Sequence, residues 1–301
     1  MKVKAHFSSR CLHFFSTCFY FSVHTNMLIA VAAMAQCALS YLIFKSAISY
    51  PIILLEGSAT LLLYNFSLYL AKPADPMRSP YKRTRWVFSH LPIMYLFSAL
   101  AAIIFFYSFL NIGWTSRFFL AFTGLCSFSY SFPLYKQEGR WVGLRQLPTA
   151  KIFHIAAVWV LSSVCLPYVD LYSQGIIVDP YLLGTLMLLK FLFLLICTLP
   201  FDIRDLKQDS YYHLKTIPTL LGANKAKRLC YLLLITHSIA LIFTSYGFAI
   251  QGGLWLTNLF IFGLLKGVIF KSQAHYHYAY LLDFAMIVQY ALVFFISFFY
   301  G

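Results

Sequence analysis

Apolar residues dominate the chain in long runs, and short polar stretches separate these runs. A helix that crosses the ~30 Å hydrocarbon core of a bilayer needs about 20 predominantly apolar residues. Pro51 and Pro180 stand at the start of two runs, where proline suits the first turn of a helix. The pattern predicts an all-α polytopic membrane protein with about nine transmembrane helices, at 27–47, 52–71, 87–110, 115–134, 151–169, 180–200, 229–248, 253–271 and 279–300.

The N-terminal segment differs from these runs. Three cations precede an aromatic-rich stretch from Phe14 to Phe21, and no small-residue cleavage site follows cleanly. We expect a short interfacial helix that leads into the first span. The alternatives are a signal peptide, or a start codon assigned too early, with the fold beginning near Met27. The predicted organisation is an interfacial segment at 1–26 and one transmembrane domain at 27–301.

The composition excludes a soluble protein. Hydrophobic residues make up 61% of the chain and charged residues 11%, whereas a soluble domain has about 25% charged residues. The 23 Lys and Arg outnumber the 9 Asp and Glu, for a net charge of +14. No basic stretch interleaved with aromatic residues lies outside a short loop, so nucleic acid is not an expected partner. An anionic headgroup or an anionic substrate is the expected target of this charge.

The cations gather in alternate loops. The loop at 169–180 contains Asp170 and Asp179 and no Lys or Arg, whereas basic residues fill the loops at 72–86, 135–150 and 201–228. Cytoplasmic loops of membrane proteins are enriched in Lys and Arg. We therefore expect a multi-pass protein of the cell's inner or plasma membrane, with its N-terminus and its basic loops in the cytoplasm.

Three of the nine acids lie together at the cytoplasmic end of the sixth predicted span. Asp202, Asp205 and Asp209 follow the spacing i, i+3, i+7, which places them on one face of a helix. Mg²⁺ commonly binds through a couple of carboxylates together with substrate phosphates. The cluster is therefore a candidate Mg²⁺ site, and the alternative is a solvated helix end that Arg204 and Lys207 neutralise.

The residues around this cluster form a motif. The chain has FDIRDLKQDS from Phe201 and TIPTLLG from Thr216. This resembles the second aspartate motif of the UbiA-type intramembrane prenyltransferases, D-x-x-D-x-x-x-D followed by T-[LI]-P-x-x-x-G. A second stretch, from Ser129 to Pro133, closes the fourth span and is similar to the Y-[ST]-x-P of that family. The predicted spans and the cytoplasmic motif loops also match, so the resemblance covers roughly 27–300.

The first motif of the family is only partly present. The family pattern is N-x-x-x-D-x-x-x-D, and here Asn65 is in place while Tyr69 and Pro73 occupy the aspartate positions. Asp75 lies two residues further on and out of helical register with Asn65. The basic residues that follow are kept, so the motif retains its anion-binding half and mostly lacks its metal-binding half. One Mg²⁺ is therefore expected in place of two.

The resemblance implies a UbiA-like bundle with a central cavity open to the cytoplasmic side. It implies Mg²⁺-dependent transfer of an isoprenyl group from a prenyl diphosphate to an aromatic or lipid acceptor, within the lipid bilayer. Asp202, Asp205 and Asp209 would hold the Mg²⁺, and Asn65 would complete the catalytic set. The implied substrate-binding residues are the diphosphate-binding cations and two tyrosines that would face a forming allylic cation, namely Arg78, Lys82, Arg83, Arg85, Lys136, Lys215, Tyr69 and Tyr130.

Two other function classes stay open. A non-catalytic relative that binds an isoprenoid or polyprenyl lipid agrees with the missing aspartates. A transporter or channel would place polar residues or broken helices near mid-membrane in matched halves, whereas the polar clusters here lie at one boundary. Asp283, just inside the ninth span, is a further functional candidate because acids within a membrane span are rarely without a role.

Overall fold

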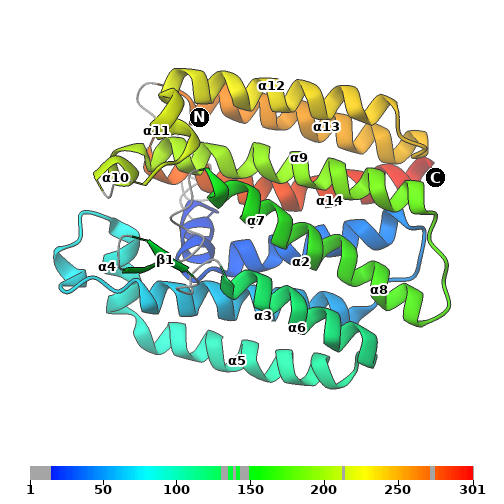
Figure 1. The fold of residues 1–301 in the computed structure, drawn as a ribbon, viewed down its shortest axis with the longest axis horizontal. Coiled ribbons are helices and arrows are strands. Elements are labelled where there is room, and N and C mark those ends of the chain that lie inside the picture. The colour runs from blue at the N-terminus through cyan, green and yellow to red at the C-terminus, as the bar shows by residue number, and fades with distance from the viewer. Residues whose placement is uncertain are drawn as a thin grey trace, which may run out of the picture.

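The computed structural model describes residues 15–129, 135–137, 140–142, 149–211, 214–271 and 275–300. Its longer helices run side by side in one bundle (Figure 1). In chain order these helices and the two π segments that continue them are α2 (Met27–Ile43), α3 (Tyr50–Leu70), α5 (Leu91–Leu110), α6 (Trp114–Ser129), α7 (Ala150–Val160), η3 (Leu161–Cys165), α8 (Leu166–Ser173), α9 (Pro180–Arg204), α12 (Ala223–Ile242), α13 (Phe248–Leu264), η4 (Leu265–Ile269) and α14 (Leu281–Tyr300).

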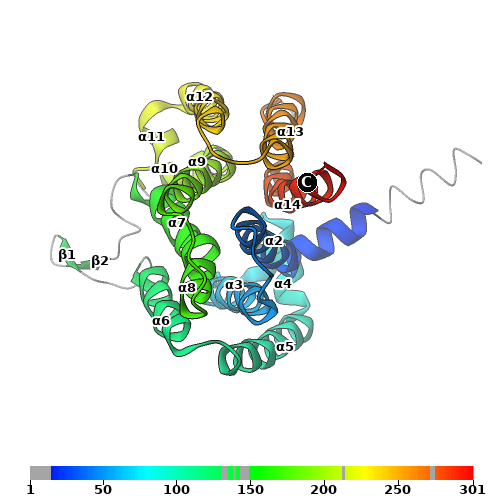
Figure 2. The same cartoon turned by 90° about the vertical axis from the view of Figure 1, so that its right-hand side faces the viewer.

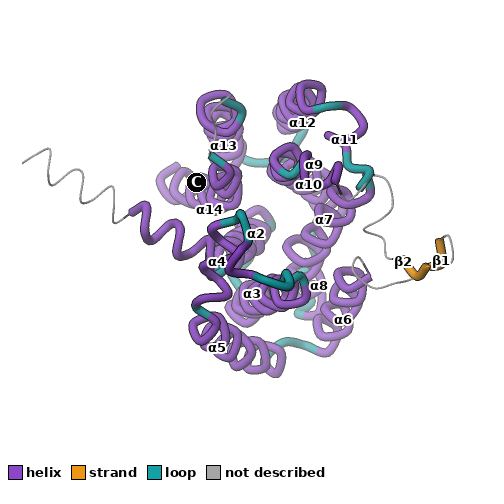
Figure 3. Tube along the Cα trace, turned by 90° about the vertical axis from the view of Figure 1, so that its left-hand side faces the viewer, coloured by secondary structure: helices purple, strands orange, loops and turns teal. Residues whose placement is uncertain are grey.

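The short elements connect these helices, and α4, α10, α11 and β1 gather at one end of the bundle (Figure 1). The strands β1 and β2 pair antiparallel, with Lys136 opposite Trp141, and the hairpin stands away from the bundle (Figure 3). This hairpin lies inside the predicted basic loop and is an addition to the expected all-α fold. The short elements are η1 (Pro76–Arg78), α4 (Lys82–Ser89), β1 (Tyr135–Gln137), β2 (Arg140–Val142), α10 (Leu206–Tyr211), α11 (Ile217–Leu221) and η5 (Tyr276–Tyr280).

Each predicted span contains a helix, but the predicted count of nine membrane-crossing helices is not confirmed. Within the described residues, six helices are long and apolar enough to cross a membrane, or seven if one bent pair forms a single span. The helix α6 has only 16 residues. The helix α12 is longer, but Lys225, Lys227 and Arg228 lie within its first two turns and lower its hydropathy. The chain is therefore a multi-pass membrane protein.

The bent pair lies at the start of the described chain. The helix Phe15–His24 turns by 84° into α2 and leaves the bundle sideways, as the dark blue helix of Figure 2 shows. Asn26 has a φ of 61° at the turn, and asparagine tolerates this left-handed conformation better than most residues. The sequence predicted an interfacial helix in this segment, and its position relative to a membrane stays a prediction. Residues 1–14 lie outside the described part.

A proline determines how the fifth span packs. The helices α7 and α8 are continuous through the π segment η3, which Pro167 follows closely. Proline has no N–H, so the carbonyl of Ser163, four residues earlier, loses its helical donor. The hydroxyl of Ser40 on α2 donates to that carbonyl at 2.6 Å. Pro167 removes a hydrogen bond within the α7–α8 helix, and the freed carbonyl accepts a hydrogen bond from α2 instead.

The helix α2 lies in the interior of the bundle, between α14, α3 and α8 (Figure 2). Ala32 and Ala33 are fully buried, and small residues allow helices to approach closely. A polar cluster crosses this apolar core, because Lys190 on α9 donates to Gln36 Oε1 at 2.5 Å. The Gln36 amide in turn donates to Gln289 Oε1 at 3.1 Å. Hydrogen bonds therefore join α2, α9 and α14 at a depth where unpaired polar groups are costly.

Candidate functional site

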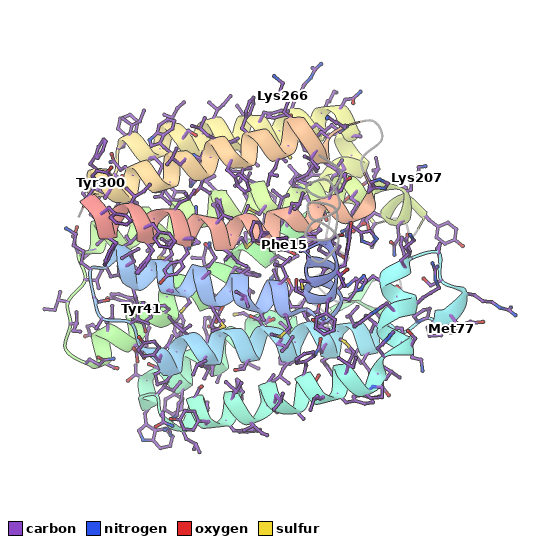
Figure 4. All side chains as sticks on the ribbon, turned by 180° about the vertical axis from the view of Figure 1, so that it is seen from behind. Phe15, Tyr41, Met77, Lys207, Lys266 and Tyr300 are labelled. Carbon is purple, nitrogen blue, oxygen red and sulfur yellow. The ribbon has the colours of Figure 1, made fainter. Side chains whose placement is uncertain are left out.

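A cavity of about 220 Å³ lies where the polar ends of several helices meet. Its apolar walls come mainly from α2, α7 and α9, and include Ile29, Ile155, Trp159 and Leu194. Its polar lining joins the turn before α2 to α4, α7, α9 and α14, through Asn26, Arg83, Lys151, Asp202, Arg204 and Asp283. The cavity therefore joins a charged end to an apolar interior. The side chains of Met77 and Lys207 lie at this same end of the bundle (Figure 4).

The first acid of the aspartate motif lies in the cavity wall. Asp202 is in the last turn of α9, and only 3% of its side chain is exposed. The Nζ of Lys151, in the first turn of α7, lies 2.6 Å from its Oδ1. A buried carboxylate is costly unless a cation pairs with it. Lys151 therefore neutralises Asp202, and 26% of the lysine side chain stays exposed.

The three acids of the motif do not share one continuous helix, as the spacing predicted. The helix α9 ends at Arg204, Asp205 follows as its C-cap, and α10 begins at Leu206. Arg204 donates to both oxygens of Asp205, at 2.9 and 2.8 Å. Asp209 lies on α10 and is buried. Asp202 and Asp205 therefore each have a cation as partner, and the break places Asp209 on a different helix.

This pairing bears on the predicted Mg²⁺. No three His, Cys, Asp or Glu side chains group closely enough to hold a metal ion in the part of the chain that the structure describes. The first motif contributes no acid, because Tyr69 and Pro73 occupy its aspartate positions and Tyr69 is exposed. The described residues therefore do not fit the metal site that the resemblance implies.

Asn65 is linked to the cavity through its neighbours. It is buried on α3, and its Oδ1 accepts a hydrogen bond from Asn26 Nδ2 at 2.8 Å. Its own amide donates to Ser98 Oγ at 2.9 Å. Asn26 Oδ1 accepts from Arg83. Asn65 therefore does not line the cavity itself but contacts Asn26, which does. Through this contact it orients Asn26 and, through Asn26, Arg83.

Two guanidinium groups meet over one aromatic ring. The Arg83 guanidinium lies 5.4 Å from the centroid of the Tyr280 ring, and the Arg204 guanidinium lies 5.3 Å from it. Arg83 also donates to the Tyr280 hydroxyl at 3.0 Å. Its Nε is buried and has no hydrogen-bond partner among the described residues. A buried cationic donor without an acceptor marks a position that an anion would satisfy.

The other predicted substrate-binding residues whose side chains the structure describes do not line the cavity. Arg78 forms an exposed ion pair with Asp75 at 3.1 Å, and Arg85 donates to the Ser79 carbonyl. Tyr69, Lys82 and Lys215 are exposed. Tyr130 lies outside the described residues, and for Lys136 the structure describes only the backbone. Arg83 is therefore the cation of the first basic loop that reaches the cavity.

Several polar cavity residues were not among the predicted site residues, including Lys151, Arg204, Asn26 and Tyr280. Lys151 opens the fifth predicted span, where a lysine is ordinarily explained by its side chain reaching the membrane surface. The signal that could have identified it is its position at the same membrane boundary as Asp202. For Asn26 and Tyr280 the sequence contains no comparable signal.

The second half of the aspartate motif builds a turn. Thr216 caps α11 together with Thr219, and Pro218 lies in its first turn. Gly222 ends α11 with a φ of 80°, a conformation that favours glycine. The T-I-P-x-x-x-G stretch therefore returns the chain from α10 to α12, and its role in the described structure is to shape this connection.

No family model and no curated protein sequence matches the chain. Three solved structures of a UbiA homolog from Archaeoglobus fulgidus are similar to it. The form bound to GPP and Mg²⁺ has a TM-score of 0.56 at 12% identity, over 91% of this chain and 98% of that one. The form bound to DMAPP and Mg²⁺ has 0.55 at 11% over 91% and 98%, and the form bound to Cd²⁺ has 0.53 at 14% over 90% and 98%. The predicted UbiA-like bundle is thus confirmed, and the chain has a UbiA-type fold in a strongly diverged sequence.

Proposed function

We propose that the chain is an intramembrane prenyltransferase that moves an isoprenyl group from a prenyl diphosphate to a lipophilic acceptor, aromatic or lipid. The observation that carries this proposal is the cavity, which joins three cations at its polar end to an apolar interior. The similar UbiA homolog has been solved with GPP and with DMAPP, which supports the same class of substrate here.

The polar end would bind the diphosphate. Lys151, Arg83 and Arg204 present fixed positive charge to one cavity. In the transfer, the bond between the allylic carbon and the diphosphate oxygen breaks, and the diphosphate keeps the electron pair. Fixed donors in a site with little water stabilise the negative charge that develops on this leaving group.

The apolar end would hold the isoprenyl group. Ile155, Trp159 and Leu194 line the cavity below the charged residues. The rings of Tyr280 and Phe201 lie beside the cations and also line the cavity. An aromatic face attracts positive charge, so these rings would stabilise an allylic cation until the acceptor attacks it. The acceptor forms the new bond to the allylic carbon and loses a proton, which the released diphosphate takes up.

Mg²⁺ dependence stays a prediction from the resemblance, because Lys151 and Arg204 already engage Asp202 and Asp205.

The orientation in the membrane is a proposal as well. The cavity end contains the basic loops and would face the cytoplasm at the cell's inner or plasma membrane. Reporter fusions after residues 84 and 224 should report the cytoplasm, and a fusion after residue 175 the opposite side.

The test is product formation by the purified full chain in nanodiscs. Radiolabelled GPP would be incubated with a panel of aromatic and lipid acceptors, and the products extracted and separated. We expect product from the native chain and a loss of about 100-fold in Arg83→Gln, since a fixed charge on the leaving group contributes roughly 3 kcal/mol. Lys266→Gln is the matched control, because Lys266 points away from the bundle (Figure 4).

A second candidate is a non-catalytic isoprenoid-binding protein. The observation in its favour is the first motif, where Tyr69 is exposed and neither Tyr69 nor Pro73 supplies a carboxylate. Saturable GPP binding without product from any acceptor would support this candidate. The absence of GPP binding would contradict both.

A further inference from the structure

The ion pair between Lys151 and Asp202 points to an unexpected way of binding the diphosphate. We propose that Lys151 takes the place of a metal ion at Asp202, and that Lys151, Arg83 and Arg204 bind the diphosphate without Mg²⁺. This proposal rests on the proposed prenyl diphosphate substrate. It differs from the expectation that the resemblance raised, since the aspartate motif then positions a lysine and not a metal.

The geometry at Asp202 supports a fixed cation. Lys151 Nζ lies 2.6 Å from Oδ1 of a carboxylate that is almost fully buried. A Mg²⁺ ion on the same oxygen would lie about 2.0–2.1 Å from it. The ammonium and the ion would then be close neighbours with charges of the same sign. A metal at this oxygen would therefore be repelled by the Lys151 ammonium, whereas an anion would be attracted by it.

The surrounding charges agree with an anion. Three cations from α4, α7 and α9 line the cavity, and two acids, Asp202 and Asp283, line it with them. An ammonium has three N–H donors, so its pairing with one carboxylate does not prevent it from also donating to a phosphate oxygen. The first motif adds no acid to this lining, because its aspartate positions hold Tyr69 and Pro73.

Arg83 adds an independent observation. Its terminal nitrogens donate to Tyr280 and Asn26, and its buried Nε has no partner among the described residues. A phosphate oxygen would accept from this nitrogen. A metal ion could not, because the unsatisfied atom is a donor. The unsatisfied group at the cavity therefore matches an anion.

The experiment measures GPP binding to the purified full chain by calorimetry, in EDTA and in Mg²⁺. We expect the native chain to bind in EDTA with a Kd within about threefold of its value in Mg²⁺. Lys151→Gln should weaken binding in EDTA by about tenfold or more. Asp202→Asn should bind in EDTA at least as tightly as the native chain, because it leaves Lys151 with its full charge. Lys266→Gln should stay within about twofold of the native chain.

Lys151→Gln leaves Asp202 without its cation, so the double variant Lys151→Gln/Asp202→Asn serves as the folding control. It has neither charge and should fold, yet bind GPP as weakly as Lys151→Gln in EDTA. Binding by the native chain in Mg²⁺ but not in EDTA, or loss of binding in Asp202→Asn, would overturn the proposal and leave the proposed function intact. No binding under either condition would instead show that the proposed function is wrong.

Discussion

Two lysines inside the bundle have contrasting partners. Lys151 lies at the cavity, pairs with the Asp202 carboxylate, and has 26% of its side chain exposed. Lys190 lies in the packed middle, is 3% exposed, and donates to the side-chain and backbone oxygens of Gln36. The carboxylate partner gives a charge pair that a ligand can still reach. The amide partner gives a buried cross-link between α2 and α9.

The two sites differ in what offsets the free energy that is lost when a charged side chain is buried. At the cavity, attraction to a carboxylate offsets much of this free energy, and residual access to water lowers the loss further. In the packed middle, neutral oxygens satisfy the donors of Lys190 and polar contacts replace water. The cavity is therefore the place where charge is available for chemistry, and the middle is where it serves packing.

The largest effect on stability should follow from breaking the cavity pair. Lys151→Met leaves the Asp202 carboxylate buried without its cation, and we expect a loss of about 3 kcal/mol in the free energy of unfolding. Unfolding by SDS titration in mixed micelles, followed by circular dichroism, would measure it. Lys151→Met/Asp202→Leu should recover most of the loss. If the single variant is as stable as the native chain, the pair is not a charge pair in the membrane.

A smaller effect should follow from removing the lysine of the packed middle. Lys190→Met leaves Gln36 Oε1 without its donor. A buried acceptor without a donor should lower the free energy of unfolding by about 2 kcal/mol. The same titration would measure this loss, and calorimetry should find GPP binding unchanged. The matched control is Lys225→Met, because Lys225 is exposed at the start of α12. Weaker GPP binding in Lys190→Met would mean that the two lysines are not separate in function.

The link behind the cavity wall should have a still smaller effect, and on binding. Asn65→Ala removes the acceptor of Asn26, which in turn accepts from Arg83. The loss of one hydrogen bond of this kind, about 1 kcal/mol, should weaken GPP binding by about fivefold. Asn111→Ala is the control, because Asn111 is exposed at the end of α5. Equal affinities for the two variants would show that Asn65 does not position Arg83.

The smallest effect should come from a hydrogen bond within the packed region. Ser40→Ala removes the donor to the Ser163 carbonyl. Hydrogen bonds between membrane helices average about 0.6 kcal/mol, so the free energy of unfolding should fall by about that amount while GPP binding is kept. Ser89→Ala, at an exposed end of α4, should change neither quantity. A change in binding for Ser40→Ala would extend the functional region into the packed middle.

Apolar runs and prolines predicted the bundle well because each acts locally. Pro51 and Pro180 do lie in the first turns of α3 and α9, and the motif around Asp202 led to the UbiA-type fold. The partners of the site residues could not be predicted. Lys151 and Asp202 meet because α7 packs on α9, and this depends on the whole bundle.

The helix break at Asp205 could not be predicted from the sequence either. The spacing of Asp202, Asp205 and Asp209 predicts one helical face, and no glycine or proline stands between them. The break coincides with a local contact, since the bidentate pair between the adjacent residues Arg204 and Asp205 forms where α9 ends. Local spacing describes which face a helix presents, but it does not state where the helix ends.

The π segment at Leu161–Cys165 affects how this chain should be aligned with its relatives. A π turn contains one more residue than the α turn it replaces. Deletion of one residue there would return the helix to α geometry and keep both its ends in phase. The same deletion in a regular stretch would rotate everything beyond it by about 100°. Alignment gaps in the fifth span therefore belong at 161–165, and a gap placed elsewhere would shift Lys151 against the residues it is compared with.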